Sequence, residues 1–362
     1  MKKSYPILEV DLKKLRHNID KVVSICGSSG ISVVGVVKGI NGFLPAMREF
    51  DESGCVGLAS SRLEHIETAR NAGLKGPFYV LRIPMPSEVS DLVRLCDVSL
   101  NSEVETLKAI DAECAEQQKT HNVILMADLG DLREGFWDKY ELVETAVFVE
   151  NKLKHVHLLG VGTNLSCYGS VNPTVEKMEE LIGIVEMVEA EIGRELEVIS
   201  GGGTTSFPLV LNGTMPKRIN NLRIGEGILN GKDLKDHWGL DMSFLILDVL
   251  TVKAEIIEVK EKPSHPQGEL FVDAYGNKPV YEDKGIRKRA LLGIGKLDVA
   301  IYEQFVPREA GVEILGGSSD HLIADITDCR KTLKVGDILE FDVRYSTMMY
   351  TSGSKYFRVE AK

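Results

Sequence analysis

The sequence repeats one local pattern eight times between residues 30 and 225: a short apolar, mostly β-branched run, a polar or glycine-rich corner, and a stretch with helical spacing. Apolar runs that do not alternate with polar residues are typical of parallel strands buried on both faces. The runs are 31–37, 56–59, 78–83, 97–100, 123–127, 156–161, 197–200 and 218–224. Eight such units over roughly 195 residues favour a (β/α)8 barrel of the TIM type over its rival, an open doubly wound sheet.

The pattern stops near residues 230–233, and the rest of the chain has strand character with few helical stretches. Further short strands are expected at 243–259, 289–294, 312–315, 321–326 and 338–345. The sequence therefore predicts an α/β barrel over residues 1–232, followed by a mainly β C-terminal domain over residues 233–362. The clearest barrel helices are expected at 62–72, 102–119, 139–151 and 174–192.

Charge and cysteine content exclude several classes of function. The 362 residues include 54 acidic and 43 basic ones, a net charge of −11, and no basic block that would favour nucleic acid or an anionic membrane. No apolar run approaches the ~20 residues of a membrane span. The six cysteines form no C-x-x-C pair, which favours reduced thiols over disulfides or a metal site. We expect a cytoplasmic protein without a metal.

Lys38 follows the first apolar run, at the carboxyl end of the expected strand, where barrel enzymes place their chemistry. Burial disfavours the ammonium form of a lysine, and the resulting amine can form a Schiff base with an aldehyde. Taken alone, Lys38 is more simply interpreted as a lysine that only extends from the barrel mouth into solvent.

Two glycine-rich corners follow the seventh and eighth runs, at 201–206 and 225–227. Glycines let backbone N–H groups approach an anion, and these loops are the usual phosphate site of such barrels. Plain glycine-rich loops are the alternative. Arg223 and Arg133 are expected at the same mouth, although either could form only an ion pair. A lysine, a phosphate pocket and a buried arginine together suggest pyridoxal 5′-phosphate (PLP).

With these residues in view, the chain resembles the alanine-racemase superfamily of PLP enzymes (fold type III), and within it the ornithine-racemase-like branch. The resemblance covers nearly the whole chain, and its motifs lie at 36–39, 222–225, 294–298, 318–325 and 335–337. It implies Lys38 as the PLP lysine, Arg223 opposite the pyridine nitrogen and Arg133 near the phenolic oxygen. The further cofactor-binding residues that it implies are Asn164, Gly203, Thr204, Thr205, Gly225, Glu226 and Tyr345.

The chain departs from the alanine racemases at three positions. Gly42 stands in place of a tyrosine four residues after the lysine, Asn164 in place of a ring-stacking histidine, and Met126 in place of a carbamylated lysine. These differences argue against alanine as the main substrate. The resemblance to the ornithine-racemase-like branch implies a basic amino acid, such as ornithine or lysine.

The resemblance implies an isomerase that exchanges the Cα proton of an amino acid, working as a homodimer with shared active sites. Lys38 would serve one face of Cα and Tyr275 the other. Ser319, Asp320 and His321 are expected near the substrate, with Asp298 or Glu226 as other acids for its terminal amine. A noncatalytic PLP-binding protein, a decarboxylase or lyase of the same fold, and a barrel aldolase remain as alternatives.

Overall fold

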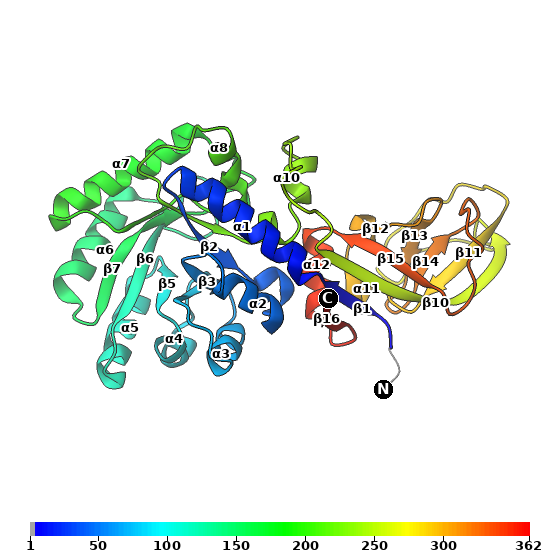
Figure 1. The fold of residues 1–362 in the computed structure, drawn as a ribbon, viewed down its shortest axis with the longest axis horizontal. Helices are drawn as coiled ribbons and strands as arrows, with labels where there is room; N and C mark the ends of the chain where they lie inside the picture. Colours follow the sequence, from blue (N-terminus) through cyan, green and yellow to red (C-terminus); the bar gives the residue numbers. More distant parts are fainter. Residues whose placement is uncertain (1–3) are drawn as a thin grey trace. The chain divides into compact units, whose positions relative to one another are not determined.

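The computed structural model describes residues 4–362, which form two compact units (Figure 1). The first unit, Leu12–Leu247, contains a closed barrel of eight strands, each parallel to its neighbours and following chain order. The barrel strands are β2 (Ser32–Val36), β3 (Gly57–Ser60), β4 (Phe78–Val80), β5 (Val98–Asn101), β6 (His121–Ala127), β7 (Val156–Thr163), β8 (Val198–Ser200) and β9 (Asn221–Ile224). All eight predicted runs are confirmed as strands.

Helices surround this barrel and alternate with its strands (Figure 1). They are α1 (Leu12–Ser28), α2 (Leu44–Asp51), α3 (Leu63–Asn71), α4 (Val89–Leu95), α5 (Val104–Gln117), α6 (Lys139–Lys152), α7 (Val175–Ile192), α8 (Phe207–Leu211), α9 (Glu226–Leu229) and α10 (Lys232–Asp236). The predicted start of α7 has a physical cause, because the Thr174 hydroxyl accepts a hydrogen bond from the Lys177 N–H.

The barrel interior is filled by side chains rather than open. Inward-facing residues of neighbouring strands form one buried cluster, made of Val34, Val36, Ala59, Tyr79, Val98, Leu100, Ile124 and Met126. Burying these side chains closes the barrel below the mouth. Polar groups can therefore gather at the carboxyl ends of the strands, where the sequence predicts the site.

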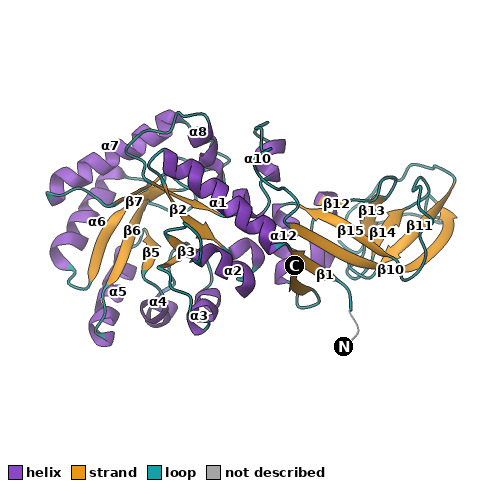
Figure 2. Cartoon of the chain, in the orientation of Figure 1, coloured by secondary structure: helices purple, strands orange, loops and turns teal. Residues whose placement is uncertain are grey.

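The second unit joins residues 4–11 to Asp248–Lys362 and is mainly antiparallel sheet (Figure 2). Its strands are β1 (Ile7–Val10), β10 (Leu250–Pro263), β11 (Ile286–Leu292), β12 (Phe305–Pro307), β13 (Glu313–Gly317), β14 (Leu322–Asp325), β15 (Ile338–Val343) and β16 (Arg358–Ala361). The rings of Phe305 and Phe341 stack in its core with centroids 4.1 Å apart. Lys253 on β10 pairs with Glu9 on β1 at 2.8 Å, which links the first strand to the sheet.

The observed units do not follow the expected limits of 1–232 and 233–362. Strand β1 belongs to the second unit because it pairs antiparallel with β10 and parallel with β16. The expected boundary falls at the start of α10, inside the first unit. A four-residue strand whose partners lie more than two hundred residues away leaves no periodicity for a local pattern to detect.

Three local expectations after residue 240 also needed correction. Residues 243–249 form turns, so the predicted strand 243–259 begins only at Leu250. The last predicted strand stops at Val343, and Tyr345 begins helix α12 (Tyr345–Gly353) instead. Strands β12 and β16 and the short helix α11 (Lys296–Val299) were not predicted, because three or four residues are too few to set a period.

Candidate active site

Lys38 stands directly after β2, where it begins a short 3-10 turn, Lys38–Ile40. Its side chain is half-buried, and burial lowers the pKa of its amine. Four groups interact with it electrostatically: Cys167 and Glu134 favour the charged form, whereas Arg133 and Arg223 oppose it. The predicted burial of this amine is present in the structure, and the lysine shares one mouth with both predicted arginines.

Arg223 on β9 is buried, with 5% of its surface exposed. One terminal nitrogen donates to the Ser200 hydroxyl and the other to the Thr163 carbonyl at 2.8 Å. Among residues 4–362, no carboxylate forms an ion pair with Arg223, and burial lowers its pKa to about 10. Burying a guanidinium against neutral groups costs free energy of folding, which indicates that the buried charge serves a function. At pH 7 the guanidinium keeps its proton and remains a hydrogen-bond donor.

Arg133 makes a bidentate ion pair with its neighbour Glu134. Arg133 Nη2 donates to Glu134 Oε1 at 2.5 Å, and Nε donates to Oε2. Burial alone would lower the pKa of Arg133, but the Glu134 carboxylate outweighs that effect and raises it. Sequence reasoning overlooked Glu134. Its adjacency to Arg133 was a possible signal, since a paired carboxylate is what fixes a guanidinium in one orientation.

Asp131 organises the loop after β7, and it too was overlooked. This carboxylate is 1% exposed and accepts backbone N–H bonds from Ser166 at 2.9 Å, Cys167 at 3.2 Å and Tyr168 at 2.9 Å. Burial would raise its pKa, but these and neighbouring N–H groups outweigh burial and lower it. At Gly169 an added Cβ would lie 2.5 Å from the Asp131 carbonyl oxygen, so the two loops meet in direct contact.

Asn164, at the start of that loop, is half-buried, and its amide donates to Cys167 Sγ at 3.0 Å. Because Cys167 also interacts electrostatically with Lys38, Asn164 lies close to the predicted cofactor lysine. Asp131 accepts the Cys167 N–H and so fixes the position of Cys167 and of the Asn164 amide bonded to it.

The two glycine-rich corners lie together at the ends of β8 and β9. The Gly227 N–H donates to the Thr204 hydroxyl at 3.1 Å, which joins the corners and leaves that hydroxyl's own proton available. The Thr205 hydroxyl, in contrast, donates its own proton to the Leu165 carbonyl at 3.0 Å. An added Cβ at Gly225 would lie 2.9 Å from Val36 Cβ, and at Gly203 it would lie 3.1 Å from the Arg223 carbonyl. Close backbone packing therefore requires small residues here, and Glu226 follows at the start of α9.

The remaining predicted site residues belong to the second unit and are described within it. Tyr275 is 47% exposed on an irregular segment, and Tyr345 begins α12. The Ser319 hydroxyl donates to Asp320 at 2.5 Å, and His321 is exposed beside them. Asp298 is buried and bonded to the Gly295 N–H at 3.1 Å and the Ser354 hydroxyl at 2.8 Å, so its carboxylate is used within the fold.

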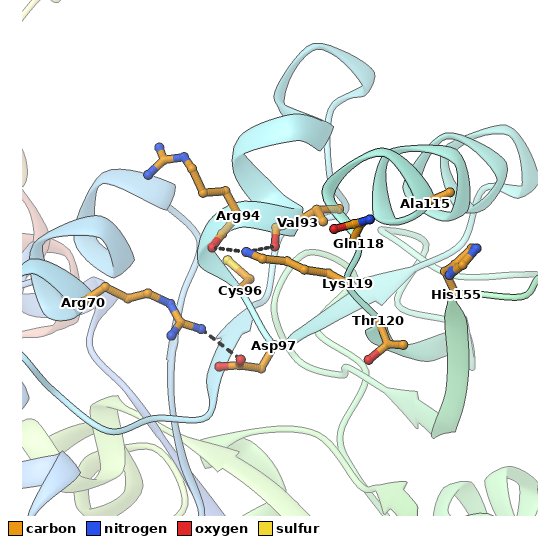
Figure 3. Close-up of a pocket in the computed structure, with 10 residues that line it drawn as sticks. All are labelled: Arg70, Val93, Arg94, Cys96, Asp97, Ala115, Gln118, Lys119, Thr120 and His155. Carbon is orange, nitrogen blue, oxygen red and sulfur yellow. Dashed lines mark hydrogen bonds and ion pairs between the residues drawn. The ribbon is translucent and has the colours of Figure 1, made fainter.

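A hollow of about 720 Å³ lies at the opposite end of the barrel, where Asp97 precedes β5 and Thr120 precedes β6 (Figure 3). Its cations already have partners. Arg70 pairs with Asp97 at 2.8 Å, and Lys119 Nζ donates to the carbonyls of Val93 and Arg94 at 3.1 and 3.0 Å. Barrel chemistry belongs to the carboxyl ends of the strands, so we assign no ligand to this hollow.

Among residues 4–362, no group of three or more histidine, cysteine or acidic side chains is arranged to hold a metal ion. No helix in the same part of the chain combines the length and the apolar character that crossing a membrane requires.

The fold and this mouth are those of a two-domain barrel enzyme, and comparison with known proteins gives the family. Residues 10–231 match the family model "Alanine racemase, N-terminal domain". The chain is 40% identical over 356 residues to the ornithine racemase of Acetoanaerobium sticklandii, covering 98% of this chain and 99% of that protein. It is 37% identical over 352 residues to the lysine racemase of Thermotoga maritima, covering 97% of each. The chain therefore belongs to the alanine racemase family.

Solved structures agree on the fold. An alanine racemase from Streptomyces lavendulae superimposes with a TM-score of 0.78 at 19% identity, covering 99% of this chain and 97% of that one. At this level of identity the likeness concerns the architecture alone. The resemblance drawn from the sequence motifs is confirmed by the family match and by both racemase relatives.

Proposed function

We propose that this protein is a PLP-dependent amino acid racemase that interconverts the L and D forms of a basic amino acid such as ornithine or lysine. Family membership and the two nearly full-length racemase relatives support the reaction and the substrate class. The single structural observation that carries the proposal is the barrel mouth, in which a half-buried Lys38 shares its surroundings with a buried Arg223 that forms no ion pair among residues 4–362. The proposed location is the cytoplasm.

The residues present fit PLP. Lys38 would hold its aldehyde carbon, and Arg223 would donate to its ring nitrogen. The paired glycine corners, with Gly203, Thr204 and Gly225, bring two loops together through the bond from Gly227 N–H to Thr204 and through packing that admits no Cβ at Gly203 or Gly225, and they would hold the phosphate. Arg133 interacts electrostatically with Lys38, and Asn164 with Cys167 beside it; they would contact the phenolic oxygen and the ring, and Thr205, Glu226 and Tyr345 complete the proposed set.

When bound, PLP supplies an electron-withdrawing ring that acidifies the Cα–H bond of the attached amino acid. The protein must then move that proton selectively. The Lys38 amine would remove or return the Cα proton from one face. Arg223 would keep its own proton and so would leave the ring nitrogen uncharged, which would limit side reactions such as transamination.

Inversion requires a second group on the opposite face of Cα, and Tyr275 is proposed for it. Ser319, Asp320 and His321 are proposed to contact the substrate, with the Asp320 carboxylate as an anion that suits a second amine. Each of these residues belongs to the second unit. Asp298 is not proposed as the contact for that amine, since its carboxylate is already bonded within the fold.

A homodimer with shared active sites is proposed on the surface of the irregular segment 264–285. This segment exposes large apolar residues, among them Phe271 at 80% and Val280 at 98%. Exposed apolar side chains gathered on one segment are typical of a surface that another chain covers. In the proposed dimer, this part of one subunit completes the barrel mouth of the other.

The first experiment incubates the purified holoenzyme with single L-amino acids in D2O. Cα deuteration is followed by NMR and the enantiomers by chiral chromatography. Deuteration with inversion of ornithine or lysine is expected. No exchange with any amino acid despite bound PLP would instead indicate a noncatalytic PLP-binding protein. Release of CO2 or loss of the side chain would indicate a decarboxylase or another lyase.

Subunit mixing tests the shared site. The K38A and Y275F variants should each be nearly inactive, yet a refolded 1:1 mixture should recover about a quarter of the wild-type activity. Half of the dimers would be mixed, and each mixed dimer would contain one site with both residues intact. A mixture that stays inactive while forming mixed dimers would contradict the sharing of sites.

A further inference from the structure

The second unit places Lys296, a lysine without a role in the mechanism above, against the ring of Tyr275. Lys296 Nζ lies 4.2 Å from the centroid of the Tyr275 ring and 5.5 Å from that of Tyr302. A cation within about 6 Å of an aromatic ring face is attracted by the negative charge of that face. The ammonium is therefore held by two rings, and Tyr275 is the nearer.

The backbone of Lys296 is fixed to the loop that contains the proposed substrate residues. The Lys296 N–H donates to the Ser318 carbonyl at 2.9 Å, and the next N–H, of Leu297, donates to the Ser319 carbonyl at 3.2 Å. A Cβ at Gly295 would lie only 2.0 Å from the Ser319 carbonyl oxygen, so the two segments touch along their backbones. Lys296 thus links Tyr275 to the loop of Ser319 and Asp320.

Tyr275 itself stands on a tight turn. Asp273 Oδ1 accepts the N–H groups of Tyr275 at 2.9 Å and Asn277 at 2.8 Å, and Gly276 has a φ of +81°. These bonds fix the backbone of the turn, but they do not fix the ring, which is 47% exposed. The Lys296 ammonium contacts the ring directly and so restricts its rotation.

We propose that Lys296 is a positioning residue for the second face of the reaction, acting through Tyr275; this inference rests on the proposed function. It orients the ring so that the phenol oxygen is presented to Cα. As the proton moves from Tyr275 Oη to Cα, negative charge remains on the phenol oxygen, and the nearby ammonium offsets it. In the opposite direction the proton returns to that oxygen, and Lys296 keeps its own protons throughout.

The test compares K296M, K296R and Y275F with wild-type holoenzyme, using the two enantiomers of ornithine separately in D2O. In K296M we expect one enantiomer to lose Cα deuteration about 10- to 30-fold, as the strength of a desolvated cation–π contact implies, while the other still exchanges without inverting. K296R keeps a cation that stacks on rings and should retain exchange within about threefold of wild type. K296M combined with Y275F should be no worse than Y275F alone.

A second readout does not depend on activity. NMR of ring-labelled tyrosine, with the Tyr275 signal assigned through Y275F, should show that signal shifted in K296M and nearly restored in K296R. The control is K278M, which removes a lysine from the segment 264–285 that contains Tyr275. Both the exchange rates and the Tyr275 signal should stay at wild-type values in this variant.

Four outcomes would overturn the inference while wild-type enzyme still racemises. Equal slowing of both enantiomers in K296M would mean a merely structural role, and exchange within threefold of wild type would mean no role. Full activity in Y275F with loss in both lysine variants would mean that the Lys296 amine itself handles the proton. A loss of Cα deuteration in K278M equal to that in K296M would mean that removing any lysine near Tyr275 has the same effect. If wild-type enzyme exchanges no amino acid, it is the proposed function that fails.

Discussion

The barrel mouth and the segment 264–285 of the second unit contain the two halves of the proposed chemistry, but they are built in opposite ways. In the mouth, Arg223 and Asp131 are buried and held by hydrogen bonds from within one rigid unit. In the segment, Tyr275 is exposed and its ring is contacted by a single ammonium. The mouth would therefore bind the proposed cofactor by itself, whereas the segment depends on few contacts and on the subunit that covers its apolar surface in the proposed dimer.

The largest expected effect concerns Lys38. The K38A variant should lose more than about 10³-fold in racemisation, because it removes both the covalent attachment and the proton carrier of one face. The PLP absorbance band of an internal Schiff base should also be absent. Activity in K38A within tenfold of wild type would show that the mouth is not where the chemistry occurs.

The next largest effect is expected at Asp131, which supports the loop of the barrel mouth but is not proposed to contact the cofactor or the substrate. D131N should lower kcat/KM about 10- to 100-fold and destabilise the protein by about 2 to 4 kcal/mol, because an amide cannot accept the same set of charge-assisted N–H bonds. Chemical denaturation and steady-state kinetics measure the two effects. D20N, which removes one negative charge from the exposed face of α1, serves as a control for the loss of charge alone.

Acid should narrow the difference in stability between wild type and D131N. The folded-state pKa of Asp131 lies below its ordinary value of 3.8, so the carboxylate contributes stability at neutral pH. That contribution is lost as the pH falls below about 4 and through the folded-state pKa. The stability gap between wild type and D131N, followed by urea unfolding, should therefore narrow in acid. A gap that widens there would contradict the assigned direction.

Glu134 should matter less. E134Q keeps the shape of the side chain but removes the charge that pairs with Arg133, and we expect a loss of about tenfold in kcat with little change in thermal stability. An unchanged kcat would mean that Arg133 needs no carboxylate to stay in place.

The smallest effect is expected at the far end of the barrel. K119M removes the bonds to the carbonyls of Val93 and Arg94, and should leave kcat/KM within about twofold of wild type. A large loss of activity in this variant would require a second functional site in the hollow of Figure 3.

Patterns that repeat locally were predictable from sequence, and single contacts between distant segments were not. The eight runs, Lys38 and Arg223 follow from strand periodicity and from the rule that places chemistry at strand ends. Asp131 was overlooked because an acidic residue in a loop has no distinctive signal until its N–H partners, some 35 residues away, are known. Lys296 lies within the motif 294–298 but has no sequence signal of its own, since its contact with Tyr275 is set by tertiary packing.

Strand β1 has a consequence for how this protein is made. Residues 7–10 leave the ribosome before the barrel does, yet their partners in β10 and β16 emerge only after the entire barrel has been synthesised. The barrel segment Leu12–Leu247 can therefore begin to fold while the segment before it is still waiting. Strand β16 completes the sheet that β1 enters, so loss of either strand damages the same domain.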